Sequence, residues 1–247
     1  MLSTEDHGDV TVLRIEHGRV NALDLELLEA LTLAVTGSDR ALVITGTGSA
    51  FSAGVDLRRI LDGGARYTED FLTALSRMFR AVFDHPRPTV AAINGHAIAG
   101  GCVLALACDA RLMSAGRIGL AELAVGVPFP VAALEIVRHA LGPGTDRVVL
   151  QAEVVDRDRA LALHLVDEVT WSDELLTDAL ALARELDSRP ADVYAATKER
   201  LHRPAVAAME TTAADDAAVL AGWTSEQARQ SIEAALAALT ARRPVEG

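Results

Sequence analysis

The sequence predicts an α/β fold, and three observations lead to that prediction. Short apolar runs typical of buried strands, such as residues 41–45 and 89–93, alternate with segments that have the composition of helices. Each of these two runs leads into a glycine-rich segment. After Val169 the pattern becomes wholly helical. We therefore expect alternating strands and helices in the core, followed by a helical C-terminal region.

The first hundred residues contain clear strand and helix signals. The predicted elements are a strand over 10–15, an amphipathic helix over 25–35 that begins near Asp24, a strand over 42–45 and a helix over 69–84. Gly63 and Gly64 predict a flexible break before the last of these helices. Pro86 and Pro88 end it, because proline lacks the amide hydrogen that a helix interior needs.

The rest of the chain predicts further strands and then helices alone. The expected elements are a buried helix over 102–107, strands at 110–114 and 117–118, a helix over 131–141, and C-terminal helices over 172–187, 191–202 and 205–239, the last stretch holding one or two helices. Ser172 is the expected N-cap of the first C-terminal helix. We place a domain boundary near residue 190, which divides the chain into a core, 1–190, and a C-terminal helical region, 191–247.

Charge, cysteines and hydropathy restrict the class of protein. The formal net charge of −12 argues against nucleic acid or an anionic membrane surface as the main partner. Cys102 and Cys108 are the only cysteines, and we expect reduced thiols in the core. The histidines show no metal-site spacing, so no metal is expected. Without a signal pattern or a run of ~18 apolar residues, we expect a soluble, cytoplasmic protein with no membrane partner.

The two glycine-rich segments are the strongest functional signal. They read GTGSAFSAGVDL at 46–57 and NGHAIAGGC at 94–102. Glycine permits positive φ and lets a ligand approach the main chain, so such segments can present free N–H groups to developing negative charge. Either segment alone also fits an ordinary turn. In the second, a helix start after the glycines adds further free N–H groups, and the Gly100 N–H is expected to point outward.

These segments, taken with a third, resemble a known family. FSAGVDL at 51–57, the stretch 94–109 and IGLAE at 118–122 are similar to three ordered motifs of the crotonase superfamily, the enoyl-CoA hydratase and isomerase family. The resemblance extends from about Asp9 to Val169 and is strongest between Ala41 and Pro130. It implies a ββα spiral core that binds an acyl-CoA thioester. It implies no separate cofactor, because coenzyme A is part of the substrate.

The resemblance also implies catalytic groups. The backbone N–H groups of Val55 and Gly100 correspond to the two donors that hold the thioester oxygen as it takes on enolate charge. Glu122, which also fits an ordinary helix start, corresponds to one of the two glutamates of the hydratases. The other glutamate position is Val103 here. A hydratase needs two carboxyl groups to hold and split water, whereas a double-bond shift needs one base, so the pattern is closer to the Δ3,Δ2-enoyl-CoA isomerases.

Further residues are implied to contact coenzyme A. The resemblance assigns this role to Val20, Ala22, Ala53, Asp56, Leu57, Arg58 and Gly101. Some of these residues also have a simpler structural interpretation. Asp56 fits the N-cap of a helix that starts near Leu57, Arg58 fits an ordinary surface arginine as well as a partner of the CoA phosphates, and residues 20–23 fit a lead-in to the first helix.

Other functions are also open from the residues alone. A hydrolase would use Ser52 as nucleophile and His96 as base, but the nucleophile elbow requires a glycine two residues before the serine, where Ala50 stands. An enoyl-CoA hydratase of the fatty acid β-oxidation type, or a crotonase-fold protein that binds acyl-CoA without turnover, are further alternatives. Glu135 is a helix residue or a second acid in the acyl pocket.

Assembly into oligomers is a further expectation. The resemblance implies a homotrimer or a dimer of trimers. It also implies that the C-terminal helical region, 191–247, packs over the active site as a lid or against a neighbouring subunit. The C-terminal helices carry an apolar stripe that a small appendage is not expected to bury on itself, namely Leu175, Leu176, Ala179, Leu180 and Ala183.

Overall fold

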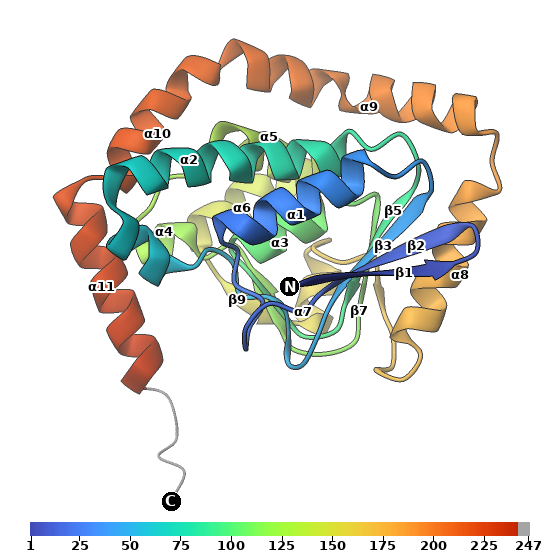
Figure 1. Cartoon of the computed structure of the whole chain (residues 1–247), viewed down its shortest axis with the longest axis horizontal. Helices are drawn as coiled ribbons and strands as arrows, with labels where there is room; N and C mark the ends of the chain where they lie inside the picture. The colour runs from blue at the N-terminus through green and yellow to red at the C-terminus, as the bar shows by residue number, and fades with distance from the viewer. Residues whose placement is uncertain (242–247) are drawn as a thin grey trace, which may run out of the picture.

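The computed structural model describes residues 1–241, which form two sheets surrounded by helices (Figure 1). Within this range the larger sheet has the order β1-β2-β3-β5-β7-β10, and the smaller has the order β4-β6-β8-β9. The strands of the larger sheet are β1 (Leu2–His7), β2 (Val10–Ile15), β3 (Ala41–Gly46), β5 (Thr89–Ile93), β7 (Ala110–Met113) and β10 (Glu168–Val169). Those of the smaller sheet are β4 (Ala50–Ser52), β6 (His96–Ile98), β8 (Arg117–Gly119) and β9 (Val154–Asp156).

A repeated unit of two strands and a helix builds the core. Strands β3, β5 and β7 lie in the larger sheet, and each is followed by a short parallel strand of the smaller sheet, β4, β6 or β8. The helices that complete the three units are α2 (Leu57–Phe83), α3 (Gly100–Leu106) and α4 (Glu122–Val125). The predicted α/β class with a ββα spiral core is therefore confirmed.

Both faces of the larger sheet are covered at its centre, which explains why β3 and β5 are buried at every position. In β3, Leu42 and Ile44 face the main core beneath α1 (Leu25–Thr36) and α2, while Ala41 and Val43 face α8 (Leu175–Asp187). Successive side chains of a strand point to opposite faces, so a sheet covered on both sides needs apolar residues at every position.

Helix α2 starts where the Asp56 N-cap predicts and continues into the helix predicted over 69–84. The helix begins at Leu57, where the Asp56 side chain caps the N–H groups of Arg58 and Arg59 at 3.1 Å. Gly64, with φ 67° and ψ −165°, interrupts the helical backbone. The expected break is thus a kink inside one long helix, because glycine adopts positive φ without the clash that a Cβ causes.

The apolar stripe of α8 packs within its own chain. Leu175, Ala179, Leu180 and Ala183 are buried against the larger sheet, and Leu176 is partly buried there. The stripe therefore gives no support for an interface with another subunit. The predicted N-cap is also wrong: the helix starts at Leu175 after a turn in which the Glu174 and Leu175 N–H groups bond to the Trp171 carbonyl.

The remaining helices cover one side of the core and one end of it. They are α5 (Val131–Leu141), α6 (Thr145–Gln151), α7 (Arg157–Ala162), α9 (Ala191–Thr211), α10 (Asp216–Trp223) and α11 (Glu226–Ala241). Helix α9 crosses α5, and α10 and α11 lie against α2, with α11 also reaching α4 (Figure 1). Helix α9 continues through Pro204, beyond its predicted end at residue 202, because Ala205 and Met209 are buried on the core.

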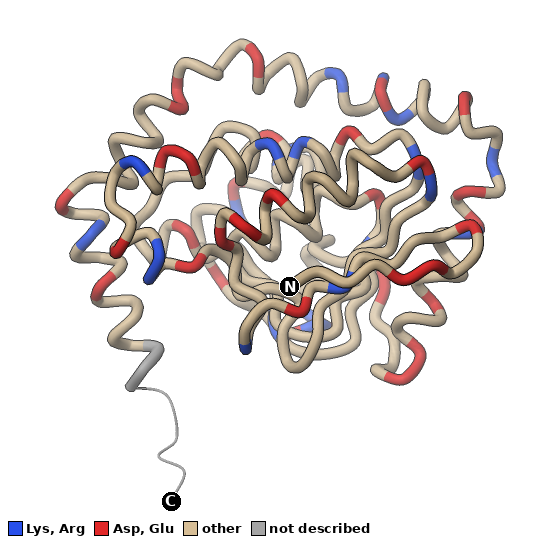
Figure 2. The backbone as a smooth tube through the Cα atoms, viewed as in Figure 1, with Lys and Arg blue, Asp and Glu red and all other residues tan. Residues whose placement is uncertain are grey.

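The boundary near residue 190 coincides with the step from α8 on the sheet to α9 across α5. Separate folding of 1–190 and 191–247 stays a prediction, and residues 242–247 of the second unit lie outside the described residues. Basic and acidic residues are interspersed along the chain (Figure 2). None of the helices within residues 1–241 is long and apolar enough to cross a membrane.

Candidate active site

A cavity of about 370 Å³ lies between the smaller sheet's loops and the helices at one end of the molecule. Its floor comes from the two glycine-rich segments and α4, and its walls come from α2, α10 and α11. The lining includes Ala53, Val55, Leu57, Leu75, Phe79, Ile98, Ala99, Gly100, Val103, Glu122, Val125, Trp223, Ala235 and Ala238. The lining is mainly apolar, as expected of a small-molecule site.

Val55 carries a free backbone donor at this cavity. The residues on either side of it are hydrogen-bonded, because Gly54 O accepts from Leu23 N at 2.8 Å and Asp56 N donates to Leu23 O at 2.9 Å. None of the intramolecular hydrogen bonds found within residues 1–241 uses the Val55 N–H. This amide is thus available to a ligand in the cavity.

Gly100 provides a second donor. It is the first residue of α3, where the N–H has no carbonyl one turn earlier in the helix. Ala99 before it adopts φ 50° and ψ −119°, a conformation that non-glycine residues rarely adopt. Its N–H bonds to Gly119 O at 2.8 Å, which anchors the loop on β8. The Gly100 N–H is unused by any intramolecular hydrogen bond of the described chain.

The two donor segments touch at Gly54. A Cβ added to this glycine would lie 2.5 Å from Ile98 O and 3.2 Å from Gly100 N, and its φ is +82°. Only glycine permits so close an approach of the two backbones. The contact brings the Val55 and Gly100 amides to the same cavity, as a two-donor anion site requires.

Glu122 is the only ionisable side chain among the described residues that line the cavity. It begins α4, is 7% exposed, and its Oε2 has no hydrogen-bond partner within residues 1–241. Burial disfavours the charged form and raises the pKa of Glu122 to about 7. A carboxyl group with this pKa is suited both to accept and to return a proton near neutral pH.

Val103 lines the cavity beside these groups and is 1% exposed. It follows Gly100 by one turn of α3. An apolar side chain therefore occupies the position where the resemblance implies a glutamate in hydratases.

The alternative candidates do not join this site. Glu135 is buried on α5, does not line the cavity and pairs with Arg138 at 2.7 Å. The Ser52 hydroxyl donates to Asn21 O at 2.7 Å and accepts from Gly54 N, so it supports the loop. His96 is exposed on β6, where Nδ1 lies 3.2 Å from the Arg117 amide.

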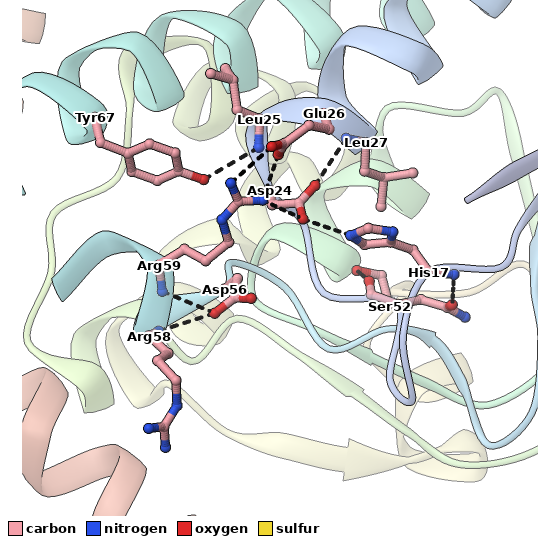
Figure 3. Close-up of polar contacts among 11 residues, drawn as sticks. His17, Asp24, Leu25, Glu26, Leu27, Ser52, Asp56, Arg58, Arg59 and Tyr67 are labelled. Atoms are coloured by element: carbon pink, nitrogen blue, oxygen red, sulfur yellow. Dashed lines mark hydrogen bonds and ion pairs between the residues drawn. The ribbon is translucent and has the colours of Figure 1, made fainter. Parts of the chain in front are cut away.

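Only two of the seven residues implied to contact coenzyme A line the cavity. Ala53 and Leu57 line it, while Val20, Ala22, Asp56, Arg58 and Gly101 do not. Val20 is exposed. Its carbonyl accepts a hydrogen bond from Ala53 N at 3.0 Å, so it lies beside the donor loop. The Arg58 side chain extends away from the neighbouring polar cluster (Figure 3). Gly101 is buried, and a Cβ there would lie 2.2 Å from Ser52 O.

The C-terminal helices lie over the cavity, as the resemblance implies for a lid, but none of their individual residues was predicted as part of the site. Trp223 of α10 is buried and donates from Nε1 to Pro128 O at 2.8 Å. Ala235 and Ala238 of α11 complete that side. A tryptophan in an otherwise Ala-rich segment was the available signal, because buried indoles need a hydrogen-bond acceptor and a packed surface.

Comparisons with known proteins agree with this fold. Residues 5–244 match the family model of enoyl-CoA hydratase/isomerase. The chain is 37% identical over 182 residues to a putative enoyl-CoA hydratase of Thermus thermophilus, which is 72% of each chain. It resembles the structure of a Mycobacterium tuberculosis enoyl-CoA isomerase at 32% identity and a TM-score of 0.81, covering 88% of this chain and 97% of that one.

The human mitochondrial Δ3,Δ2-enoyl-CoA isomerase has the same fold, with a TM-score of 0.92, 23% identity and coverage of 98% of this chain and 99% of that one. The chain belongs to the enoyl-CoA hydratase/isomerase family, within the crotonase superfamily.

Proposed function

We propose that this protein shifts the double bond of a 3-enoyl-CoA to the conjugated 2-position, with Glu122 as the single acid and base. The observation that carries the proposal is that Glu122 is the only ionisable side chain among the described residues that line the cavity. One carboxyl group is sufficient for a double-bond shift, because the proton removed from C2 is the proton needed at C4.

The reaction follows from the three groups at the cavity. The Glu122 carboxylate takes a proton from C2. The electron pair that remains is shared by C2, C4 and the thioester oxygen of the resulting dienolate. The N–H groups of Val55 and Gly100 stabilise the charge on that oxygen. Glu122 then returns the proton at C4, which leaves the double bond between C2 and C3 and restores the carboxylate. No other reactant is consumed, and the coenzyme A moiety belongs to the substrate.

Hydration of a 2-enoyl-CoA is the second candidate, and the names of several curated relatives favour it. A hydratase positions water between two carboxyl groups. Val103 supplies no carboxyl group, and Glu135, the other nearby candidate, is paired with Arg138 outside the cavity lining. These two observations support isomerisation over hydration.

The choice between the reactions is tested on one protein preparation. We expect conversion of a 3-enoyl-CoA to the trans-2-enoyl-CoA to be faster than hydration of a 2-enoyl-CoA. Both reactions are followed by the absorbance of the conjugated enoyl thioester, which rises in the first and falls in the second. Val103→Glu should shift the balance toward hydration, because it adds the missing carboxyl group next to Glu122.

Val103→Gln is the matched control, since it has the same size as glutamate but no proton to exchange, and it should not raise hydration. Hydration that exceeds isomerisation in the wild type would contradict the single-glutamate assignment. A Gln variant that hydrates as well as the Glu variant would show that polarity alone is responsible.

The path of coenzyme A is part of the same proposal. The backbone of residues 20–23 and 53–57 would hold the pantetheine and adenine moieties, and Arg58 the phosphates. The exposed Val20 and Arg58, beside a loop whose Ala53 and Leu57 line the cavity, support this path. The buried free thiols Cys102 and Cys108 suit a reducing compartment, which supports a cytoplasmic location.

Assembly into a homotrimer or a dimer of trimers is also proposed. Large apolar side chains exposed on the single chain support it, among them Leu150 at 71%, Trp171 at 67% and Leu201 at 63%. We expect light scattering at micromolar concentration to give a mass of three or six chains. A monomer under these conditions would refute the assembly.

A further inference from the structure

The loop that carries the Val55 donor is held by the segment before α1. Three backbone hydrogen bonds join the two: Ala53 N to Val20 O at 3.0 Å, Leu23 N to Gly54 O at 2.8 Å, and Asp56 N to Leu23 O at 2.9 Å. They lie on both sides of Val55. The direction of the Val55 N–H therefore depends on where residues 20–23 are placed.

Asp24 fixes the end of that segment. Its side chain is nearly buried, with the residue 5% exposed, and its Oδ1 accepts from Leu27 N at 2.9 Å as the N-cap of α1. Its Oδ2 lies 2.6 Å from His17 Nε2 and accepts from Arg59 Nη1 at 2.9 Å (Figure 3). Burial opposes ionisation, but these hydrogen bonds outweigh it and keep the pKa of Asp24 below its usual value.

Arg59 reaches this carboxylate from the other side of the donor loop. It lies three residues after Asp56, in the first turn of α2. Its guanidinium bonds Asp24 and also Glu26, with Nη2 at 2.8 Å from Glu26 Oε1, and it lies 5.4 Å over the ring of Tyr67 (Figure 3). Arg59 thus ties the start of α2 to the start of α1.

The Asp24–Arg59 pair closes a ring around the donor loop. One end follows Leu23 directly, and the other follows Asp56, so the two hydrogen bonds that flank Val55 lie between them. The Arg59 side chain is 39% exposed. The Asp24 side chain is only 6% exposed, so the loss of its partner also costs stability, and an effect on catalysis has to be measured separately from an effect on folding.

We propose that Asp24 and Arg59 are positioning residues, which set the direction of the Val55 N–H toward the thioester oxygen. The inference rests on the oxyanion site of the proposed function. Neither residue lines the cavity, so the ion pair affects the rate of reaction through the backbone of the donor loop.

The test uses Arg59→Met and Asp24→Asn in the full chain. Asparagine is also a good N-cap, so Asp24→Asn keeps the start of α1 while it removes the charge. We expect kcat to fall about tenfold with KM changed by less than about twofold, because small misplacement of a catalytic group lowers the rate more than the affinity. Arg59→Lys should have a higher kcat than Arg59→Met, because lysine retains the positive charge but lacks the planar guanidinium that bonds two carboxylates at once.

A second readout does not need turnover. A bound 2,4-dienoyl-CoA absorbs at longer wavelength when hydrogen bonds polarise its carbonyl, so its red shift reports the donors directly. We expect Arg59→Met and Asp24→Asn to reduce this shift. Arg80→Met is the matched control, because it removes an exposed ion pair with Asp84 at the far end of the same helix, and it should leave kcat and the red shift unchanged.

Unchanged kcat and red shift in both variants would overturn the proposal. A lower melting temperature with the red shift intact would also overturn it, because the pair would then serve stability alone. A red shift that depends on Arg59 in a protein that does not isomerise 3-enoyl-CoA would uphold the positioning role while refuting the proposed reaction.

Discussion

Glu122→Gln is expected to lower the turnover of a 3-enoyl-CoA by about 10²- to 10⁴-fold, because a positioned base contributes that much to the rate. The affinity for an acyl-CoA should stay within about twofold, since glutamine has the same shape and the donors at Val55 and Gly100 are untouched. Steady-state kinetics and equilibrium titration with a 2-enoyl-CoA measure the two effects separately.

The pH profile gives the same experiment a second measurement. The base acts as a carboxylate, and burial raises the pKa of Glu122 to about 7. Wild-type kcat/KM should therefore fall as the pH drops below about 7, while the residual activity of the variant should not follow this curve. Because the pKa of Glu122 is raised from 4.5 to about 7 on folding, the stability that the protonated carboxyl group contributes is lost as the pH rises from about 4.5 to about 7. Above this range wild type has the cost of a buried carboxylate, so the variant should melt no lower than wild type at pH 8.

Glu135→Gln is the matched control, because Glu135 is equally buried at 8% exposed but lies outside the cavity lining. Its turnover should remain close to that of wild type. An active Glu122→Gln enzyme would refute the assignment of the base. Measurable acyl-CoA binding by the wild type without turnover of any enoyl-CoA would favour the non-catalytic alternative.

The sequence predicts the parts of the site that are built from neighbouring residues. Strand β3, the glycines after it and the N-cap Asp56 lie close together in the chain, so strand, donor loop and helix start are all visible in one stretch. Glu122 is recognisable in the same way, because it closes a short motif after β8. These features depend on the backbone geometry of adjacent residues, so they can be predicted from short stretches of sequence.

The walls of the cavity depend on packing between distant segments. Phe79 and Trp223 line the same cavity although they lie far apart in the sequence. The Asp24–Arg59 ion pair was also not predicted, because the sequence indicated Asp24 only as the start of a helix. Periodicity identifies an apolar or polar face but not the surface that covers it.

The stripe of α8 illustrates that limit. Its spacing correctly indicates one apolar face, but the covering surface is the larger sheet of the same chain. The three-residue strands β4 and β6 were likewise not predicted, because three residues are too few to show the alternation of apolar and polar side chains.

Gly54→Ala is expected to lower kcat by about 10²- to 10³-fold, the effect of losing one oxyanion donor. The new Cβ would lie 2.5 Å from Ile98 O and 3.2 Å from Gly100 N, at a φ of +82° that alanine rarely adopts. Neither backbone segment can yield without moving its donor. The loss of rate should therefore be accompanied by a smaller red shift of a bound 2,4-dienoyl-CoA.

Gly48→Ala separates the two causes. Gly48 also has positive φ, at +65°, but a Cβ there would meet nothing within 4 Å. This variant carries the strain of the conformation without the intrusion between the two donor segments, so it should lose some stability and keep its kcat. If both variants lost the same fraction of activity at equal loss of melting temperature, strain would explain the result and the contact at Gly54 would have no special role. If only Gly54→Ala loses both rate and red shift, the close approach of the two backbones is what holds the donors together.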